Sequence, residues 1–581
     1  MCGISGVIKF GAAEVQVSEL KRMSNRMVHR GPDGFGLWTN SKKNVGLAHQ
    51  RLSIIDVTDG GHQPMISKSK RYTITFNGEI YNYLELKEML QKRGYKFYSD
   101  SDTEVLLSMF EWKQEQMMPY LDGMFAIAIW DEQTQRLFCA RDRFGEKPFY
   151  YTNTKEEFVF ASEIKALWEY GVSKAVKSDN LIKFIKTGKL FSDVPNSTFY
   201  QHIKELQPSS YFHLVGEEEI VFKKYWKIDY EQQLSFNSES DLIEKYNGLF
   251  TQSIRRRLRA DVEIGSSLSG GLDSSSIVAK VNKMKRKGQV QKAFSAVFPN
   301  FAIDESTYIN ELVNKYPDIE LHTTIPNSQN IFKLLDKAVE AQDEPFGSSS
   351  ILAQYAVMEI AKKNGVTILL DGQGADEVLS GYVFSYSRYL EQLFYTKPTL
   401  YTKERAQFNK HFDGSNIHND LRAKETVRMR LGRYRRNLIP AKNEYRFRLK
   451  EHLYDLTFNG SLKSLLRYAD RNSMANSLEV RLPFLSHELV EFIFQLPDKF
   501  LLREGWTKWI HRKSTEHILP KSISWRVDKI GFEPPQKSWI NNDEVNSIVE
   551  KQASFYEVKD YKDEAYLQNI KWRLLLSSYY Q

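Results

Sequence analysis

A cysteine stands directly behind the initiator methionine, where it could act as a nucleophile. Cys2 and Cys139 are the two cysteines in a chain of 581 residues. A structural cysteine usually lies inside a strand or helix, with neighbours packed on all sides. If Met1 is removed, Cys2 carries both a thiol and a free α-amine, and together these form a nucleophile with its own base.

A thiol that attacks an amide also needs hydrogen-bond donors for the oxyanion that develops. The tripeptide Asn77-Gly78-Glu79 follows the strand-like run YTITF. There an amide side chain and a backbone N–H could point at one oxygen, next to an acid. Taken alone, such a tripeptide is more often a turn than an active site.

The second half of the chain contains a loop that could bind phosphate. In the run SSLSGGLDSSSIVAKV, residues 269–274 separate an apolar strand from a helix whose apolar residues share one face. Such a turn exposes several backbone N–H groups at a helix N-terminus. It is not a Walker loop, because the pattern GxxxxGK[ST] is absent. A second strand opens into a glycine-rich turn with acids, ILLDGQGADEVLSGY (368–382).

The elements that must position these residues fall into two halves. Up to about residue 215 the apolar pattern mostly alternates, which predicts strands in YTITFNG, MFAIAIWD, RLFCARD, PFYYT and EFVFAS. Helix-like segments near Val17–Val28 and Tyr83–Arg93 interrupt them, so this half reads as α+β. Cys139 lies inside one of the strands and is interpreted as a core residue.

Helical periodicity dominates beyond the polar stretch 227–241, which is interpreted as a connection. A strand-turn-helix unit at 262–284 and a strand at 366–370 predict an α/β sheet, followed by a helix-rich tail from about Tyr382.

Length and composition indicate a multidomain globular protein. A chain of 67.8 kDa is too long for one core, and its 41% hydrophobic and 27% charged residues are ordinary for such proteins. No apolar run is long enough for a membrane span. The net charge of +8 is mild, and we interpret the basic runs 255–259 and 428–436 as solvated helix faces. Neither nucleic acid nor a membrane is expected as a partner, and two cysteines favour a reducing, cytoplasmic location.

Several first-half motifs, in order behind the Met-Cys start, resemble the class II glutamine amidotransferase domain. They are HRGPDG, AHQRLSIID, SDSDTE, LDGMFAIAIWD, RDRFGEKPFYY and ASEIKAL. The resemblance covers residues 2–215 and implies an N-terminal nucleophile hydrolase fold, with antiparallel sheets stacked between helices. By this resemblance Cys2 attacks the glutamine carboxamide, its α-amine relays the proton, and Asn77 with Gly78 forms the oxyanion hole. The form that retains Met1 would be an inactive glutaminase.

The same resemblance implies how glutamine is held. Arg51 would pair with the α-carboxylate, because a planar guanidinium can donate two parallel hydrogen bonds to a planar carboxylate. Glu79 and Asp102 would hold the α-ammonium.

The motif SGGxDS resembles the pyrophosphate loop of the ATP pyrophosphatases. The resemblance extends to the glutamine-hydrolysing asparagine synthetases when two later motifs are included, LLRYADRNSMANSLEVRLPFL and SWRVDKIGF. It implies that residues 216–240 are a connection and that residues 241–581 form the synthetase domain. It implies ATP and Mg²⁺ as cofactors, with Asp273 and Asp376 as metal ligands. The residues implied for ATP or pyrophosphate are Leu268, Ser269, Gly270, Gly271, Asp273, Ser274, Val297, Asp371, Gly372 and Lys529.

The implied reaction is the ATP-dependent amidation of aspartate with ammonia from glutamine. Two positions depart from the family pattern. Gln373 stands where a glutamate would accept a proton, and an amide cannot serve as that base. Tyr468 stands where a basic residue would face the acceptor. Aspartate is favoured, and a uronic acid or a biosynthetic intermediate is the alternative acceptor.

Other families share only parts of this pattern. A phosphoribosyl-transferring amidotransferase has no use for SGGLDS, and a β-lactam synthetase has no use for Cys2. A nucleotide-binding protein without activity would not need both sets of loops. A homodimer is compatible with the sequence.

Overall fold

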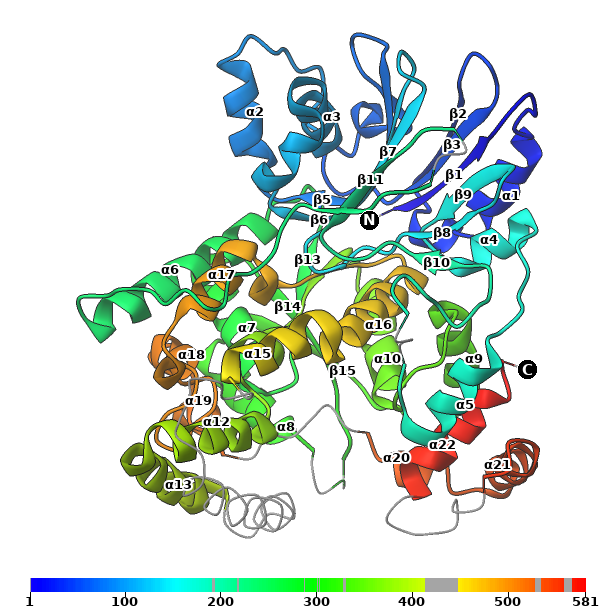
Figure 1. Ribbon diagram of the computed structural model, residues 1–581. Coiled ribbons are helices and arrows are strands. Elements are labelled where there is room, and N and C mark those ends of the chain that lie inside the picture. Colours follow the sequence, from blue (N-terminus) through cyan, green and yellow to red (C-terminus); the bar gives the residue numbers. More distant parts are fainter. Residues whose placement is uncertain are drawn as a thin grey trace, which may run out of the picture.

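The computed structural model describes most of the chain and places it in two units (Figure 1). The described residues are 2–190, 194–216, 219–286, 288–299, 301, 304–327, 331–412, 448–527, 534–558 and 567–580.

In the first unit, two antiparallel sheets stack between two helical layers (Figure 1). One sheet has the order β10-β8-β9-β1-β3-β2 and the other β12-β11-β7-β6-β5-β4. Helices α1 and α4 cover the first sheet, whereas α2 and α3 cover the second. The strands are β1 Gly3–Lys9, β2 Gly34–Thr39, β3 Val45–Arg51, β4 Met65–Ile66, β5 Tyr72–Ile80, β6 Gly123–Asp131, β7 Arg136–Arg141, β8 Tyr150–Asn153, β9 Glu157–Ala161, β10 Lys204–Glu205, β11 Ser210–Leu214 and β12 Lys223–Lys224, and the helices are α1 Val17–Asn25, α2 Tyr83–Gln91, α3 Asp102–Lys113, α4 Ile164–Tyr170 and α5 Ser178–Thr187.

The predicted antiparallel architecture is confirmed. The five predicted strands correspond to β5 to β9, and the two predicted helices to α1 and α2. Cys139 on β7 is fully buried, in an apolar cluster with Ile4 of β1 and Ala128 of β6, so its interpretation as a core residue is confirmed as well.

Two segments differ from the sequence-based expectation. The motif SDSDTE leads into helix α3, because the Ser101 side chain accepts a hydrogen bond from the Thr103 N–H and caps the helix. The connection 216–240 contains β12, which pairs with β11 and so extends the second sheet.

The second unit contains a parallel sheet of five strands, in the order β15-β14-β13-β16-β17, which confirms the predicted α/β architecture. Its strands are β13 Ile264–Ser267, β14 Gln291–Ala296, β15 Ile319–Thr324, β16 Ile368–Leu370 and β17 Glu479–Arg481. The α-helices are α6 Glu239–Arg257, α7 Leu272–Met284, α8 Ser306–Lys315, α9 Ile331–Gln342, α10 Ser350–Lys363, α11 Ala375–Leu379, α12 Val383–Thr396, α13 Pro398–Phe412, α15 Leu449–Tyr454, α16 Ser461–Ala475, α17 His487–Gln495, α18 Trp509–Thr515, α19 Lys521–Ser524, α20 Gln536–Trp539, α21 Asp543–Phe555 and α22 Leu567–Ser577. The helix-rich tail begins at α12, as predicted, but it also contains β17, which forms one edge of the parallel sheet.

Within the described residues, no helix is both long and apolar enough to span a membrane.

The first basic run lies at the contact between the two units, so its interpretation as a solvated face is wrong. Arg257 is buried and its guanidinium lies 4.4 Å from the centre of the Tyr81 ring. Arg256 pairs with Asp122 of the first unit at 2.7 Å. The charges are therefore used to join the units. The second run, 428–436, lies outside the described residues.

Two candidate active sites

Cys2 lies just before β1, at a buried point between the two sheets. Its backbone nitrogen, which becomes the α-amine when Met1 is removed, donates a hydrogen bond to Asn77 Oδ1 at 3.1 Å. The carbonyl oxygen of Cys2 accepts from Arg30 Nε at 3.0 Å. Burial raises the pKa of the Cys2 thiol, and a backbone hydrogen bond from Leu52 and the charge of Arg51 oppose this shift. The thiol therefore needs a base to become a nucleophile.

Asn77 and Gly78, the residues predicted to form the oxyanion hole, lie on β5, where Asn77 contacts Cys2. Asn77 Oδ1 is engaged by the Cys2 N–H, and Asn77 Nδ2 donates to Ser162 Oγ at 3.5 Å, which leaves the second hydrogen of the amide as a donor close to Cys2. Gly78 has a φ of 154°, and a Cβ there would lie 2.0 Å from the Met124 carbonyl oxygen. This position accepts no larger residue, and its backbone follows Asn77 directly.

Arg51 ends β3 and is held by the loop that follows. Its guanidinium donates to the carbonyl oxygen of Thr58 at 2.7 Å and to that of Asp56. Gly61 permits this packing, because a Cβ there would lie 2.0 Å from Arg51 Nη2. The Arg51 charge lowers the pKa of the Cys2 thiol, although burial outweighs it. Arg51 is thus a fixed cation near the nucleophile.

Glu79 and Asp102 form a buried pair of acids near the same point. Glu79 lies on β5, and Asp102 at the start of α3 accepts from the Ile80 N–H at 2.9 Å. Burial raises the pKa of Asp102 to about 6. Burial and the Asp102 charge raise the pKa of Glu79 well above its usual range. Two such carboxyls would be stabilised by an added cation, and the α-ammonium of an amino acid supplies one.

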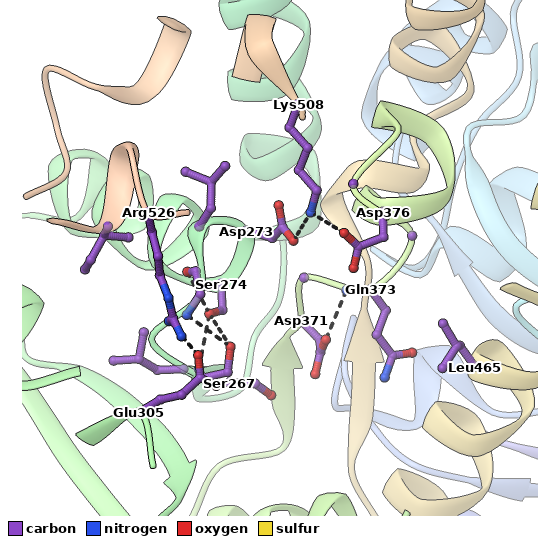
Figure 2. A pocket seen from close by; sticks show the side chains of 18 of the residues that line it. Ser267, Asp273, Ser274, Glu305, Asp371, Gln373, Asp376, Leu465, Lys508 and Arg526 are labelled. Carbon is purple, nitrogen blue, oxygen red and sulfur yellow. Dashed lines mark hydrogen bonds and ion pairs between the residues drawn. The ribbon is translucent and has the colours of Figure 1, made fainter. Parts of the chain in front are cut away.

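The second site is a pocket at the carboxyl ends of β13 and β16, shown in Figure 2. Gly270 has a φ of 79° and turns the chain after β13. Helix α7 then begins with Asp273 in its first turn. The Ser274 hydroxyl oxygen accepts from the Ser269 N–H at 3.1 Å and so closes the loop. A helix N-terminus framed in this way suits phosphate oxygens.

Most of the nucleotide residues predicted from the sequence line this pocket. Gly270 and Val297 are not among its lining residues: Gly270 forms the turn after β13, and Val297 packs against an apolar cluster that includes Ala293 and Ile309. Lys529 lies outside the described residues. The predicted residues that line the pocket are Leu268, Ser269, Gly271, Asp273, Ser274, Asp371, Gly372 and Asp376.

The two predicted metal ligands, Asp273 and Asp376, flank the amine of Lys508 (Figure 2). Lys508 Nζ lies 2.6 Å from Asp376 Oδ1 and also pairs with Asp273. A Cβ at Gly381 would lie 1.9 Å from Asp376 Oδ1 and 2.2 Å from Lys508 Cε, so only glycine allows this approach. The ammonium thus stands where two carboxylates can share a cation.

This carboxylate pair fits Mg²⁺. Among the described residues, no group of three or more His, Cys, Asp or Glu side chains could hold a metal ion. Mg²⁺ is commonly held by one or two carboxylates and completed by substrate phosphates and water. Asp273 and Asp376 match that donor set.

Sequence reasoning did not identify Lys508, Arg526 or Glu305 as pocket residues. Lys508 has a φ of 52°, a conformation uncommon for a lysine, and caps the start of α18. Arg526 pairs with Glu305 at 2.6 Å across the nucleotide side of the pocket. The sequence carries no local signal for the Lys508–Asp273 and Arg526–Glu305 pairs, because each joins segments more than 200 residues apart.

Gln373 and Leu465 lie on the opposite side of the pocket from Arg526 and Glu305 (Figure 2). Tyr468 is not among the described lining residues; its hydroxyl accepts from the Gly347 N–H at 3.0 Å. The side of the pocket with Gln373 is therefore lined there by an amide and an apolar side chain.

Helix α16 connects the two sites. Leu465 on α16 lines the pocket. Five residues later, Asp470 accepts hydrogen bonds from both Arg30 Nη1 and Nη2, at 2.9 and 3.1 Å. Arg30 in turn contacts the Cys2 carbonyl oxygen. One buried ion pair, Arg30–Asp470, thus links Cys2 to the helix that lines the second pocket.

Comparison with known proteins agrees with this two-site arrangement. Residues 1–226 match the family model described as a glutamine amidotransferase domain, and residues 245–579 match that of asparagine synthase. The chain is 32% identical to asparagine synthetase [glutamine-hydrolyzing] 1 of Bacillus subtilis, over 97% of this chain and 92% of that protein. It is 24% identical to the amidase chry2 of Gibberella zeae, over 93% of this chain and 90% of that protein.

The two family models together cover nearly the whole chain, and the relative from Bacillus subtilis matches it over almost its full length. The chain belongs to the family of glutamine-hydrolysing asparagine synthetases.

Proposed function

We propose that this protein hydrolyses glutamine at Cys2 and uses the ammonia to amidate aspartate after its activation by ATP. The observation that supports the proposal most strongly is the buried Arg30–Asp470 pair, because Arg30 contacts the Cys2 carbonyl oxygen and Asp470 lies on the helix whose Leu465 lines the second pocket. Residues 2–215 would form the glutaminase domain and residues 241–581 the synthetase domain.

Glutamine would bind with its α-carboxylate on Arg51 and its α-ammonium on Glu79 and Asp102. The α-amine of Cys2 would take the thiol proton, and the sulfur would attack the carboxamide carbon. The oxyanion would be held by the Asn77 side chain and the Gly78 N–H. The resulting α-ammonium would return its proton to the amide nitrogen, so that ammonia leaves and a thioester remains. Water would then hydrolyse the thioester, which releases glutamate and restores the Cys2 thiol.

In the second site, a carboxylate oxygen of the acceptor would attack the α-phosphorus of ATP, and pyrophosphate would leave. The backbone N–H groups at the start of α7 would bind the pyrophosphate. Asp273 and Asp376 would hold Mg²⁺, which neutralises phosphate charge when bound. Ammonia then attacks the acyl carbon, AMP leaves, and the nitrogen loses a proton. Transfer inside the protein would keep the ammonia unprotonated.

The relatives described as asparagine synthetases support aspartate as the acceptor. One observation favours another carboxylate, such as a uronic acid or a biosynthetic intermediate. Of the described basic residues that line the pocket, Lys508 pairs with two aspartates, Arg526 pairs with Glu305, and Arg512 donates to backbone carbonyls. None of these contacts presents a cation beside Gln373 for a second carboxylate.

A panel of acceptors distinguishes these alternatives. The full chain, with Met1 removed, is supplied with glutamine, MgATP and one carboxylate at a time, and pyrophosphate and the amide product are measured. With aspartate we expect pyrophosphate and asparagine in equal amounts. Turnover of a sugar acid without turnover of aspartate would overturn the choice of acceptor, and hydrolysis of glutamine without pyrophosphate for every carboxylate would overturn the ligase function.

A further inference from the structure

We propose that Arg481 and Glu479, two residues of the synthetase unit, are positioning residues of the glutamine site and set the charge of Glu79. The inference rests on the proposed glutaminase function, in which an ionised Glu79 receives the α-ammonium of glutamine.

Strand β17 brings Arg481 to Glu79 across the contact between the units. Arg481 Nη2 lies 3.8 Å from Glu79 Oε2. Both atoms are buried, and in the described part of the chain neither has a hydrogen-bond partner. Arg481 is itself fixed, since its Nη1 donates to the carbonyl oxygens of Arg257 and Arg259 at 2.8 and 2.7 Å. The guanidinium is therefore held near Glu79 by other contacts, and it interacts with Glu79 through charge rather than through a hydrogen bond.

Glu479 competes with Glu79 for the same guanidinium. Glu479 Oε1 lies 2.5 Å from Arg481 Nε, and both side chains are fully buried. Asp102 of α3 adds a third carboxyl close to Glu79. The Arg481 guanidinium thus lies beside a cluster of three acids, and the ammonium of glutamine would add a further positive charge to this cluster.

The groups around Glu79 shift its pKa in opposite directions. Burial, then the charges of Asp102 and Glu479, raise the pKa of Glu79, whereas Arg481 and the N-terminal amine lower it. The ring centre of Tyr81, the residue that follows β5, lies 5.5 and 4.4 Å from the guanidinium carbons of Arg481 and Arg257. Loss of Glu479 should favour the ionised form of Glu79, and loss of Arg481 should disfavour it.

The backbone of Arg481 also contacts the nucleotide pocket. Its carbonyl oxygen accepts from the Asp371 N–H at 3.1 Å, where β16 pairs with β17. Asp371 and Gly372 line the pocket. The same residue therefore supports the ammonium end of the glutamine site and the second nucleotide loop.

The test measures glutamine binding against pH with the full chain, in a Cys2→Ala background that cannot hydrolyse the ligand. Titration calorimetry gives the dissociation constant between about pH 5 and about pH 8, where free glutamine keeps its ammonium and carboxylate. Binding needs ionised Glu79, so it is present above the pKa of Glu79 and is lost as the pH falls. We expect Glu479→Gln to move the midpoint of this loss down by about one pH unit and Arg481→Gln to move it up by about one.

Opposite shifts distinguish positioning from damage to the interface, since damage weakens binding at every pH. Arg256→Gln, which removes another arginine of the interface, serves as the control and should leave the midpoint unchanged. Glu479→Gln keeps the shape of the side chain and decides the question even if Arg481→Gln does not fold. A midpoint that stays or rises in Glu479→Gln overturns the inference. Failure of the chain with Cys2 intact to hydrolyse glutamine would overturn the proposed function instead.

Discussion

Replacing Cys2 with alanine is expected to abolish glutamine-dependent amide synthesis and to leave ammonia-dependent synthesis intact. Alanine keeps the α-amine and the small volume but removes the only atom that can attack the carboxamide. The loss of glutaminase rate should be about 1,000-fold or more, as for other nucleophile deletions. The measurement compares glutamate and amide formation with glutamine and with ammonium chloride as nitrogen donors.

The matched control is Cys139→Ala, because Cys139 is the other cysteine and is a buried core residue of β7. It should keep both activities. Equal loss of both activities in Cys2→Ala would mean that the cysteine supports the fold, and survival of both would refute the assignment of the nucleophile.

Replacing Asp273 with asparagine is expected to stop pyrophosphate release with either nitrogen donor while glutamine hydrolysis continues. The substitution keeps the shape of the side chain but removes one of two carboxylates that flank Lys508. Cation binding between Asp273 and Asp376 would weaken, and synthesis should fall by about 100-fold or more, since metal stabilisation of phosphoryl charge is worth several kcal/mol. Pyrophosphate and glutamate are measured in the same reaction.

Asp318→Asn provides a control for this substitution. Asp318 pairs with Lys285 at the surface, far in sequence from the loop, and its side chain is 60% exposed. This variant should retain pyrophosphate release. Undiminished release by Asp273→Asn, over a titration of Mg²⁺, would contradict the assignment of Asp273 as a metal ligand.

Local signals in the sequence predicted the strands around the nucleophile and the two nucleotide loops. Alternating apolar residues identified β5 to β9, and the loop before α7 was recognisable because its glycines and serines lie between a strand and a helix. Helix α3 was not predicted, because the motif SDSDTE looked like a loop and the capping contact of Ser101 that starts the helix is visible only in the structure. Short β17 was missed because three residues carry no periodicity, and the sheet beside it determines its conformation.

The contacts between the units could not be predicted from local pattern. Arg30 and Asp470 lie 440 residues apart in sequence, and Lys508 and Asp273 lie 235 apart. The basic run at 255–259 looked like a solvated face because its acidic partners come from distant segments, such as Asp122. Charged residues are seldom buried unless they are paired, and pairing appears only in the folded chain.

The central claim is that nitrogen released at Cys2 reaches the second site inside one molecule. The most direct test supplies [amide-¹⁵N]glutamine, MgATP and the accepted carboxylate together with an excess of unlabelled ammonium, and measures ¹⁵N in the amide product by mass spectrometry. The structure predicts that most of the product carries ¹⁵N, and that the Cys2→Ala variant gives unlabelled product. Product with the isotope ratio of the bulk ammonia would contradict internal transfer between the two sites.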